Sequence, residues 1–412
     1  MKGQTAIVAV PRGREIVRTL KCRTVIERGR AEDLLEFLVL WRDRVQWIVD
    51  LIWNLPKVPS ESQLHQLFYN ILRQQGFRAH HVKQIYKYAR AVVAGAKANK
   101  GSKPILRKLT ARLDKYDYKL DLERGIVVLK LHKDRVVILR LLHRKEYLER
   151  YKRGWQNYEL IVKCENGTFW VCIYFKRRVE FYIPLSTLVI DVNLWSISML
   201  LVDEVGDRTS IRFVKSPFEK YLRFKWRAHL LQMQYSKTWR FSKSIFARVR
   251  YWFRRARNVL TDHCWKLAKQ IALYARKNYA LVIIEKLEYV TRKKSGWKLA
   301  GFCYRKFLHA LKCKCEDLDV PYIEVDPKNT SKTCPICGSE LVFVNYRLAR
   351  CIKCGFTGHR DIIAVLNLYK KVIGKIAPLP YILLYLRPTA GVGQDEPSRR
   401  RCKPKPDVGG KE

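Results

Sequence analysis

The sequence predicts an α+β protein of several domains, and three observations support this fold class. The chain has 412 residues, which are too many for one small hydrophobic core and suit two or three domains. Apolar residues recur at helical spacing over residues 30–96, whereas residues 125–175 alternate between apolar and polar, as strands do. Four cysteines near the C-terminus form two Cys-x2-Cys pairs, the pattern of a zinc ribbon.

Both cysteine pairs lie within residues 330–361. Two cysteines three residues apart in a tight turn can direct both thiolates at one ion, and two such pairs complete a tetrahedral zinc site. Gly338 and Gly355 each follow the second cysteine of a pair, where the turn favours a positive φ. The predicted zinc ligands are Cys334, Cys337, Cys351 and Cys354.

Because four thiolates leave no open position for water, this zinc is expected to hold structure and not to catalyse. The alternative is four buried or disulfide-bonded cysteines, but paired spacing with paired glycines rarely arises from packing alone. The other eight cysteines share no spacing rule, and we interpret them as free thiols in a reducing compartment.

The net charge of +45 comes from 82 Lys and Arg against 37 Asp and Glu. Self-repulsion on this scale destabilises a lone folded chain, so a polyanion such as nucleic acid is the expected partner. A basic protein of the membrane surface is the alternative. The sequence has no run of 18 apolar residues and no signal-peptide pattern. We therefore expect no membrane partner and a location in the cytoplasm or on the nucleoid.

The N-terminal half combines an early strand, a helical stretch and a later group of strands. The early strand is expected at 16–25, and three helices follow within 30–96, with Ser60 and Ser62 offering an N-cap for the second of them. If the early strand pairs with the later ones, the helices form an insertion in a β domain; the sequence leaves this pairing open. The later strands are expected at 125–131, 135–142, 158–164 and 168–175.

Two basic regions are candidates for contact with nucleic acid. The third expected helix carries Lys83 and Lys87 among tyrosines, although a solvated helix face explains this pattern equally well. Residues 223–257 hold eleven Lys and Arg, nine aromatic residues and no acid, and the helix is expected to continue to residue 277. Cations there can neutralise phosphates while rings stack on bases; amphipathic membrane binding is the alternative. The candidate contacts are Lys225, Arg227, Arg240, Arg248, Arg250, Arg254 and Arg255.

Three acids stand within or at the ends of expected elements. Asp191 lies in an apolar strand, Glu285 follows the buried strand 280–284, and Asp361 opens a helix after the last cysteine pair. A buried carboxylate needs a cation beside it, although a surface acid at a strand end is the alternative for Asp191. Clustered carboxylates can hold two Mg²⁺ or Mn²⁺ ions for phosphodiester hydrolysis. These positions suit an RNase H-like sheet.

From about residue 186 onward, the chain resembles the TnpB family of insertion-sequence proteins, which are RuvC-like nucleases related to type V CRISPR effectors. The resemblance rests on VIDVN, on the basic helical stretch before VIIEKL, on TSKTCPICG with CIKCGFTGHRD, and on RDIIAVLNLY. It implies an RNA-guided endonuclease that carries a guide RNA from the transposon end and cleaves double-stranded DNA. It also suggests a monomer with one RNA.

The resemblance further implies a RuvC-like nuclease domain with an inserted zinc ribbon, and a β-barrel wedge domain interrupted by a helical recognition domain. The expected boundaries are 1–29 and 106–185 for the wedge, 30–105 for the recognition domain, 186–327 and 361–388 for the nuclease, 328–360 for the ribbon, and 389–412 for a disordered basic tail.

Residue by residue, the family's catalytic acids fall on Asp191, Glu285 and Asp361, which would bind Mg²⁺ or Mn²⁺. Its zinc thiolates fall on the four paired cysteines. Val189 and Asn193 replace the glycines that usually flank the first acid, and asparagine tolerates positive φ better than most residues.

Three further positions depart from the family pattern. Lys286 replaces an acid common after the glutamate, and Ile363 and Val365 replace a common Asn and Ala after the last aspartate. These changes bear on the tuning of the metal site and leave the three acids in place.

Two other functions remain open. A nuclease-dead relative would use its guide RNA only to occupy DNA, but such relatives lose an acid and this chain keeps all three. A transposase that breaks and rejoins DNA by itself, or a DNA-binding protein associated with one, is the other alternative. The resemblance favours the nuclease.

Overall fold

The computed structural model describes residues 13–193, 196–203, 208–286, 300–345 and 347–377. Two compact units divide the described chain, one formed by residues 13–180 and the other beginning at residue 181. The expected disordered tail, 389–412, lies outside the described residues.

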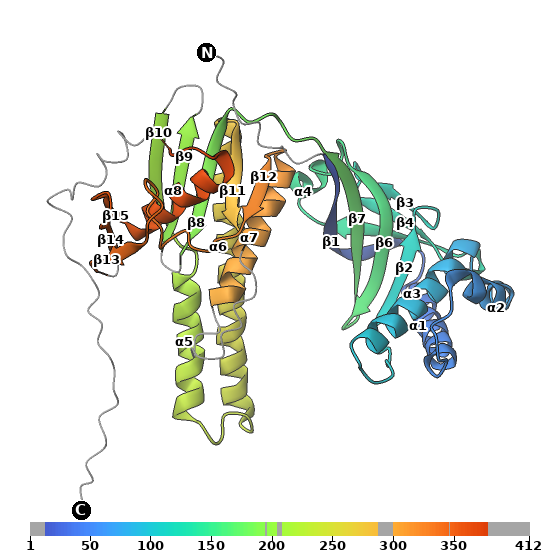
Figure 1. The fold of residues 1–412 in the computed structure, drawn as a ribbon. Helices are drawn as coiled ribbons and strands as arrows, with labels where there is room; N and C mark the ends of the chain where they lie inside the picture. Colours follow the sequence, from blue (N-terminus) through green and yellow to red (C-terminus); the bar gives the residue numbers. More distant parts are fainter. Residues whose placement is uncertain (1–12, 194–195, 204–207, 287–299, 346, 378–412) are drawn as a thin grey trace, which may run out of the picture. The chain divides into compact units, whose positions relative to one another are not determined.

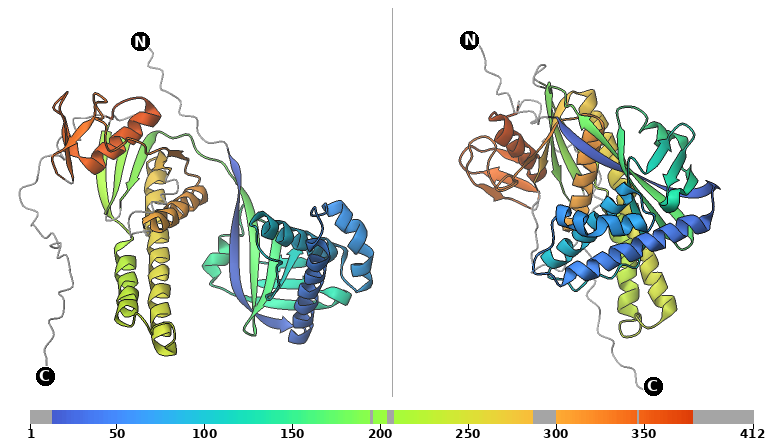
Figure 2. Two further views of the ribbon diagram at one scale, coloured as in Figure 1. Left: turned by 60° about the horizontal axis from the view of Figure 1, so that its bottom comes forward. Right: turned by 90° about the vertical axis from the view of Figure 1, so that its right-hand side faces the viewer.

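The 13–180 unit contains a curled seven-stranded sheet and three long helices (Figures 1 and 2). The strand order is β2-β6-β7-β1-β5-β4-β3. Its strands are β1 (Arg14–Arg28), β2 (Leu109–Asp114), β3 (Tyr118–Asp121), β4 (Ile126–Lys130), β5 (Val136–Leu142), β6 (Gln156–Glu165) and β7 (Thr168–Val179). Its helices are α1 (Ala31–Trp53), α2 (Glu61–Gln74), α3 (Ala79–Ala98), the short α4 (Lys145–Glu149) and the 3-10 turn η1 (His132–Asp134).

The early strand pairs antiparallel with both β5 and β7, which resolves the pairing that the sequence left open. Helices α1 to α3 are therefore an insertion between β1 and the remaining strands of its sheet. Apolar residues of the three helices join those of the sheet in one continuous core. The predicted cap at Ser60 is confirmed, since its Oγ accepts from Gln63 N at 3.3 Å and Gln63 Oε1 accepts from Ser60 N at 2.9 Å.

Strands β2 and β3 were not expected from the sequence, and they form the two edges of the sheet. No pairing joins these two edges among the described residues, so the strands form a curled sheet where the resemblance implied a barrel. Helices α1 and α3 pack beside β2. The edge of the sheet formed by β2 is therefore packed against helices.

The second unit is built on a five-stranded sheet with the order β10-β9-β8-β11-β12 (Figure 1). Strands β8, β9 and β10 pair antiparallel, whereas β11 runs parallel to both β8 and β12. Its strands are β8 (Ser186–Val192), β9 (Ser196–Asp203), β10 (Arg208–Lys215), β11 (Ala280–Glu285) and β12 (Tyr322–Val325). Its helices are α5 (Glu219–Gln234), α6 (Lys243–Lys277), α7 (Ala300–Asp317) and α8 (Arg360–Ile373).

Alternate residues of the central strands face opposite cores. Leu188 and Ile190 pack with α6 and α7, whereas Val189 packs with α8. Between β12 and α8 lies a small sheet of β13 (Leu341–Phe343), β14 (Leu348–Cys351) and β15 (Thr357–His359). Helix α8 is thus the element that follows this small sheet and covers one face of the large one.

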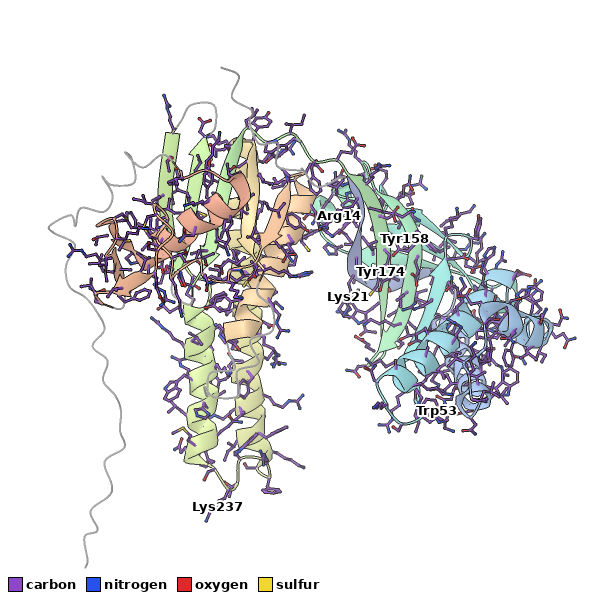
Figure 3. The ribbon with its side chains drawn as sticks, in the orientation of Figure 1. Arg14, Lys21, Trp53, Tyr158, Tyr174 and Lys237 are labelled. Atoms are coloured by element: carbon purple, nitrogen blue, oxygen red, sulfur yellow. The ribbon has the colours of Figure 1, made fainter. Side chains whose placement is uncertain are left out.

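The single long helix expected from 223 to 277 is wrong, because the chain reverses at residues 235–242. Ser242 begins the new helix, and its Oγ accepts from Ile245 N at 3.5 Å. Helices α5 and α6 form an antiparallel hairpin that projects from the sheet, with Lys237 at its tip (Figure 3). Across the described parts of the chain, no helix combines the length and the apolar character needed to cross a membrane.

Candidate carboxylate site and cysteine cluster

The register of β8 and β11 places two of the predicted acids side by side. Val189 pairs with Ile283 and Ile190 with Ile284, so Glu285 ends its strand next to Asp191. Both carboxylates are buried, with 6% and 8% of their surface exposed. Their side chains share a hydrogen bond.

The third acid is held at the start of α8. His359 is the N-cap of this helix, and its ring Nδ1 accepts a hydrogen bond from Asp361 N at 3.3 Å. The acceptor role of Nδ1 leaves the ring proton on Nε2. The ring also makes an edge contact with Phe213 on β10, with 6.0 Å between the ring centroids.

The electrostatics of the site follow from burial and from like charges. Burial raises the pKa of the Asp191 carboxyl, and the charge of Asp361 raises it further, while a hydrogen bond from Asn193 opposes the shift. Burial also raises the pKa of Glu285, with Asp191 as the second cause. Arg360 and Lys371 are the cations near these two acids. A divalent cation would remove the repulsion that raises both pKa values.

The structure therefore brings the three acids into one electrostatic neighbourhood at the ends of β8 and β11 and the start of α8. Among the described residues, however, the group whose ligand atoms all lie within 4.8 Å of one another is the cysteine cluster and not the carboxylates. Oxygen donors of this kind suit Mg²⁺ and Mn²⁺. The carboxylate oxygens of the three acids are thus spread more widely than the four thiols.

The four cysteines converge as their spacing predicts. Sγ of Cys334 lies 3.5 Å from Sγ of Cys354, and Sγ of Cys337 lies 3.4 Å from Sγ of Cys351. Tetrahedral zinc with bonds of about 2.3 Å separates its sulfur ligands by roughly 3.8 Å, so the cluster needs little adjustment to accept zinc.

Both turns of the cluster have the glycine geometry that we predicted. Gly338 has a φ of +76° and Gly355 a φ of +74°. Gly338 N donates to Cys334 O at 2.9 Å and Gly355 N to Cys351 O at 3.1 Å, which closes each turn. The close approach of the four sulfur atoms thus depends on two similar turns, each with a glycine at positive φ.

The basic and aromatic residues of 223–257 lie on the α5–α6 hairpin and stack on one another. Arg227 lies 4.9 Å from the ring centroid of Trp252, which is itself stacked on Phe224 at 5.7 Å. The Arg255 guanidinium covers Phe224 at 5.3 Å. Further pairs join Arg240 to Trp239 and Arg250 to Phe246, while Arg248 and Arg254 are exposed and Lys225 is half-buried.

The two lysines predicted on α3 differ from each other. Lys83 is exposed, whereas Lys87 is half-buried and pairs with Glu61 at 3.2 Å. Lys87 is therefore partly neutralised within its own unit, and Lys83 keeps the better placement for an external phosphate.

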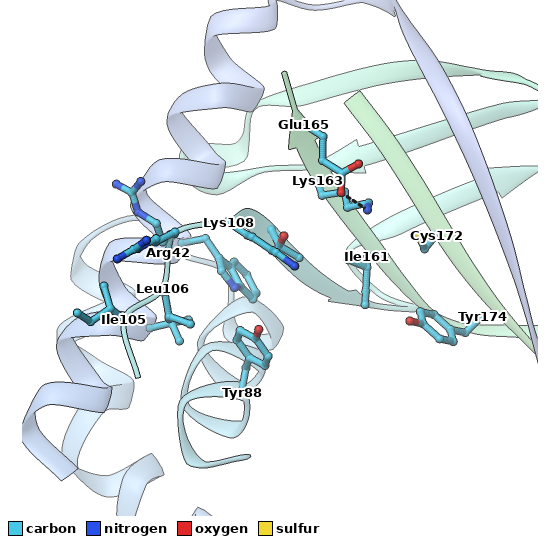
Figure 4. Close-up of a pocket in the computed structure, with 14 residues that line it drawn as sticks. Arg42, Tyr88, Ile105, Leu106, Lys108, Ile161, Lys163, Glu165, Cys172 and Tyr174 are labelled. Carbon is cyan, nitrogen blue, oxygen red and sulfur yellow. Dashed lines mark hydrogen bonds and ion pairs between the residues drawn. The ribbon is translucent and has the colours of Figure 1, made fainter. Parts of the chain in front are cut away.

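Sequence reasoning missed a hollow of about 480 Å³ in the 13–180 unit, shown in Figure 4. Tyr88 and Tyr174 supply rings to its lining, and Arg42 and Lys108 supply cations. Lys163 also lines it and pairs with Glu165. These residues come from α1, α3, β6, β7 and the segment before β2, so no local sequence pattern could have grouped them.

Two polar residues beside the acids were also missed or misread. Asn193, which stands where a glycine was expected, donates from Nδ2 to Asp191 Oδ2 at 2.7 Å and does not have a positive φ. Ser198 lies opposite Asp191 in the β8–β9 register, and its buried Oγ makes no hydrogen bond among the described residues. Asn193 thus acts through its side chain, not through backbone freedom.

Comparison with known proteins agrees with this arrangement. Residues 304–368 match the family model for the Cas12f1-like TNB domain. TnpB-like protein MJ0751 of Methanocaldococcus jannaschii is 28% identical over 243 residues, covering 56% of this chain and 83% of the relative. TnpB-like protein MJ1635 of the same organism is 23% identical over 362 residues, covering 83% of each.

Two solved structures share the fold at low sequence identity. The protein of a Cas12f1–sgRNA–target DNA complex aligns with a TM-score of 0.55 and 13% identity, covering 86% of this chain and 98% of that one. The mini-RNA-guided endonuclease CRISPR-Cas_phi3 aligns with a TM-score of 0.54 and 12% identity, covering 88% and 93%. These two matches show a shared fold, and the curated relatives with the matched domain show that the chain belongs to the TnpB family.

Proposed function

We propose that this protein is a transposon-encoded, RNA-guided DNA endonuclease that hydrolyses DNA at Asp191, Glu285 and Asp361 with two Mg²⁺ or Mn²⁺ ions. The observation that carries the proposal is the gathering of these acids, from positions 94 and 76 residues apart in the sequence, at one end of a mixed sheet. Two of them are buried with raised pKa values, and a divalent cation bound between them would stabilise their charged forms.

The topology of the second unit supports a RuvC-like nuclease. Three antiparallel strands followed by two parallel ones, with helices on both faces, form the arrangement expected of an RNase H-like sheet. In this proposal 186–327 and 361–388 form the nuclease and 328–360 a zinc ribbon. The 13–180 unit then supplies the wedge and its inserted recognition helices.

The nucleic-acid partners are proposed from charge and from the relatives. A net charge of +45 favours a polyanionic partner, and the stacked arginines of the α5–α6 hairpin suit phosphates and bases. One structural relative was solved with a guide RNA and target DNA. We assign the same two partners to this chain, with one RNA per monomer.

The test compares cleavage of one plasmid by protein loaded with a matched or an unmatched guide RNA in the presence of Mg²⁺. The proposal predicts a cut only with the matched guide, and no cut by the Asp361→Ala protein carrying that guide. If RNA-free protein cuts the target equally well, the proposal is wrong and a self-sufficient transposase is the better account. If only binding is observed, the chain is an RNA-guided DNA binder.

A further inference from the structure

Helix α8 belongs to two hydrophobic cores at once. Val365 and Leu366 pack with Val189 and Ile283 of the large sheet. Ile363, only two residues after Asp361, packs instead in the ribbon core that contains Cys334 and two other cluster neighbours, Leu341 and Phe356. The helix that carries the third acid is therefore fixed by the sheet on one side and by the cysteine cluster on the other.

Polar contacts tie the same helix to the segment that carries the first cysteine pair. Asn367 is 6% exposed, and its Nδ2 donates to Thr330 O and Thr333 O, both at 2.7 Å. The amide group thus donates two hydrogen bonds to backbone carbonyls in the segment before Cys334. The Asn367 amide can keep this position only while the backbone from Thr330 to Thr333 keeps its conformation.

Lys370, one turn further along α8, reaches inside the first Cys-x2-Cys turn. Its Nζ donates to Pro335 O at 2.9 Å and to Ile336 O at 3.4 Å, the carbonyls of the two residues between Cys334 and Cys337. The geometry of this turn is set by its two thiols when they bind a metal. The position of the Lys370 ammonium group therefore depends on the conformation of this turn.

From these contacts we infer that the cysteine ribbon is a positioning device for the carboxylate site, acting through Asn367 and Lys370 on α8. The inference rests on the proposed function, because it takes Asp361 as a ligand of the catalytic ions. A helix is stiff along its axis, so a shift at Lys370 or Asn367 is carried to its first turn, where Asp361 lies. Neither Asn367 nor Lys370 touches the reacting groups; both orient the helix that carries one of them.

The test uses full-length protein and four variants on α8 or just beyond it. Lys370→Met and Asn367→Leu remove the donors while keeping similar side-chain volume. Lys370→Arg keeps donors at that position, and Lys375→Met removes an exposed lysine just past the helix as a matched control. For each protein, zinc content is measured by elemental analysis, and Mn²⁺ binding by the rise in melting temperature during a Mn²⁺ titration.

We expect the Mn²⁺ concentration for half of the thermal shift to rise by about tenfold or more in Lys370→Met and Asn367→Leu, the usual cost of losing partners that orient a metal ligand. Lys370→Arg should recover most of the loss, and Lys375→Met should match the wild type. Unchanged Mn²⁺ binding in both donor-removing variants would overturn the coupling. If the wild type itself shows no Mn²⁺-dependent shift, the carboxylate site of the proposed function fails as well, which separates the two claims.

Discussion

The cysteine cluster and the proposed carboxylate site are built in opposite ways. The four thiols come from one segment, 334–354, and their sulfur atoms all lie within 4.8 Å of one another. The three acids come from β8, β11 and α8, and their placement depends on strand register and helix packing. The four thiols are close enough to surround one ion, whereas the carboxylate oxygens do not all lie within the same distance of one another.

This difference predicts that the two sites respond differently to substitution. A local site is specified by a few turns, and its metal supplies folding free energy directly. The carboxylate site combines residues from distant elements. Its charged form is unfavourable, since burial and neighbouring acids raise the pKa values of Asp191 and Glu285. Metal binding at the cysteines would therefore stabilise the fold, whereas the buried acids lower the stability of the fold while they are charged and without a cation.

The largest effect is expected from a substitution that removes an acid from the carboxylate site. Asp191→Ala removes a ligand of the proposed ions, whose stabilisation of the transition state is several kcal/mol, so cleavage should fall by about a thousandfold or more. Guide RNA and target binding should persist, because the residues proposed to bind phosphates lie on other elements. Single-turnover cleavage and gel-shift assays on the same preparation measure both quantities, and cleavage at wild-type rate in this variant would rule out Asp191 as a metal ligand.

Breaking the cysteine cluster should instead damage folding. Cys351→Ser removes a buried thiol from the set, so zinc content should fall from about one equivalent and the ribbon should lose its structure. Limited proteolysis would then cut within 328–360. Full zinc content and an intact ribbon in this variant would contradict a four-thiolate site, and Cys313→Ser, at a half-buried cysteine outside the cluster, is the control.

The stability of the folded protein should depend on pH through the carboxylate site. The folded-state pKa of Glu285 is raised above its ordinary value, so the folded state holds more protons than the unfolded state between the two values. This contribution to stability is complete below the ordinary pKa and is lost as pH rises through the folded one. Without Mg²⁺ or Mn²⁺, Glu285→Gln should therefore be more stable than the wild type at pH 8, by about 1–2 kcal/mol.

Thermal melts at pH 5 and pH 8, in buffer without added divalent ions, measure this difference; it should shrink at the lower pH and when Mn²⁺ is added to the wild type. Lower stability of Glu285→Gln at pH 8 would mean that the carboxylate is already satisfied by partners in the folded protein. Glu316→Gln, a change at a buried acid on α7, provides a matched control.

The smallest effect is expected in a region that belongs to neither site. Arg227→Ala removes one guanidinium stacked on Trp252 of the α5–α6 hairpin. RNA affinity should fall modestly, and the slope of log affinity against log salt should become shallower by about 0.7 to 0.9, one phosphate contact. Filter binding across a salt series measures the slope; a larger slope, or lost cleavage with unchanged binding, would assign Arg227 to another role.

The sequence predicted the cysteine cluster well because spacing and glycines act locally. It also predicted the strands that carry Asp191 and Glu285, since both are mainly apolar apart from their acids. The parallel register that sets these acids side by side joins segments 94 residues apart, and no local pattern encodes it. Placing the acids together therefore needed the family resemblance or the structure.

The misses have physical causes as well. The reversal at 235–242 contains no Gly or Pro, so the helical pattern gave no sign of a break. His81 stands beside the lysines of the third helix in the sequence, but it is fully buried and lies 3.5 Å from the buried Asp117 carboxylate. That partner is distant in sequence, and only the tertiary fold shows that the charge of this helix is lower than its sequence suggests.

Anomalous scattering from crystals soaked in Mn²⁺ would test the contrast between the two sites most directly. The account predicts one zinc peak among Cys334, Cys337, Cys351 and Cys354, and separate manganese peaks among Asp191, Glu285 and Asp361. A disulfide in place of the zinc peak, or well-ordered carboxylates with no manganese between them, would contradict it.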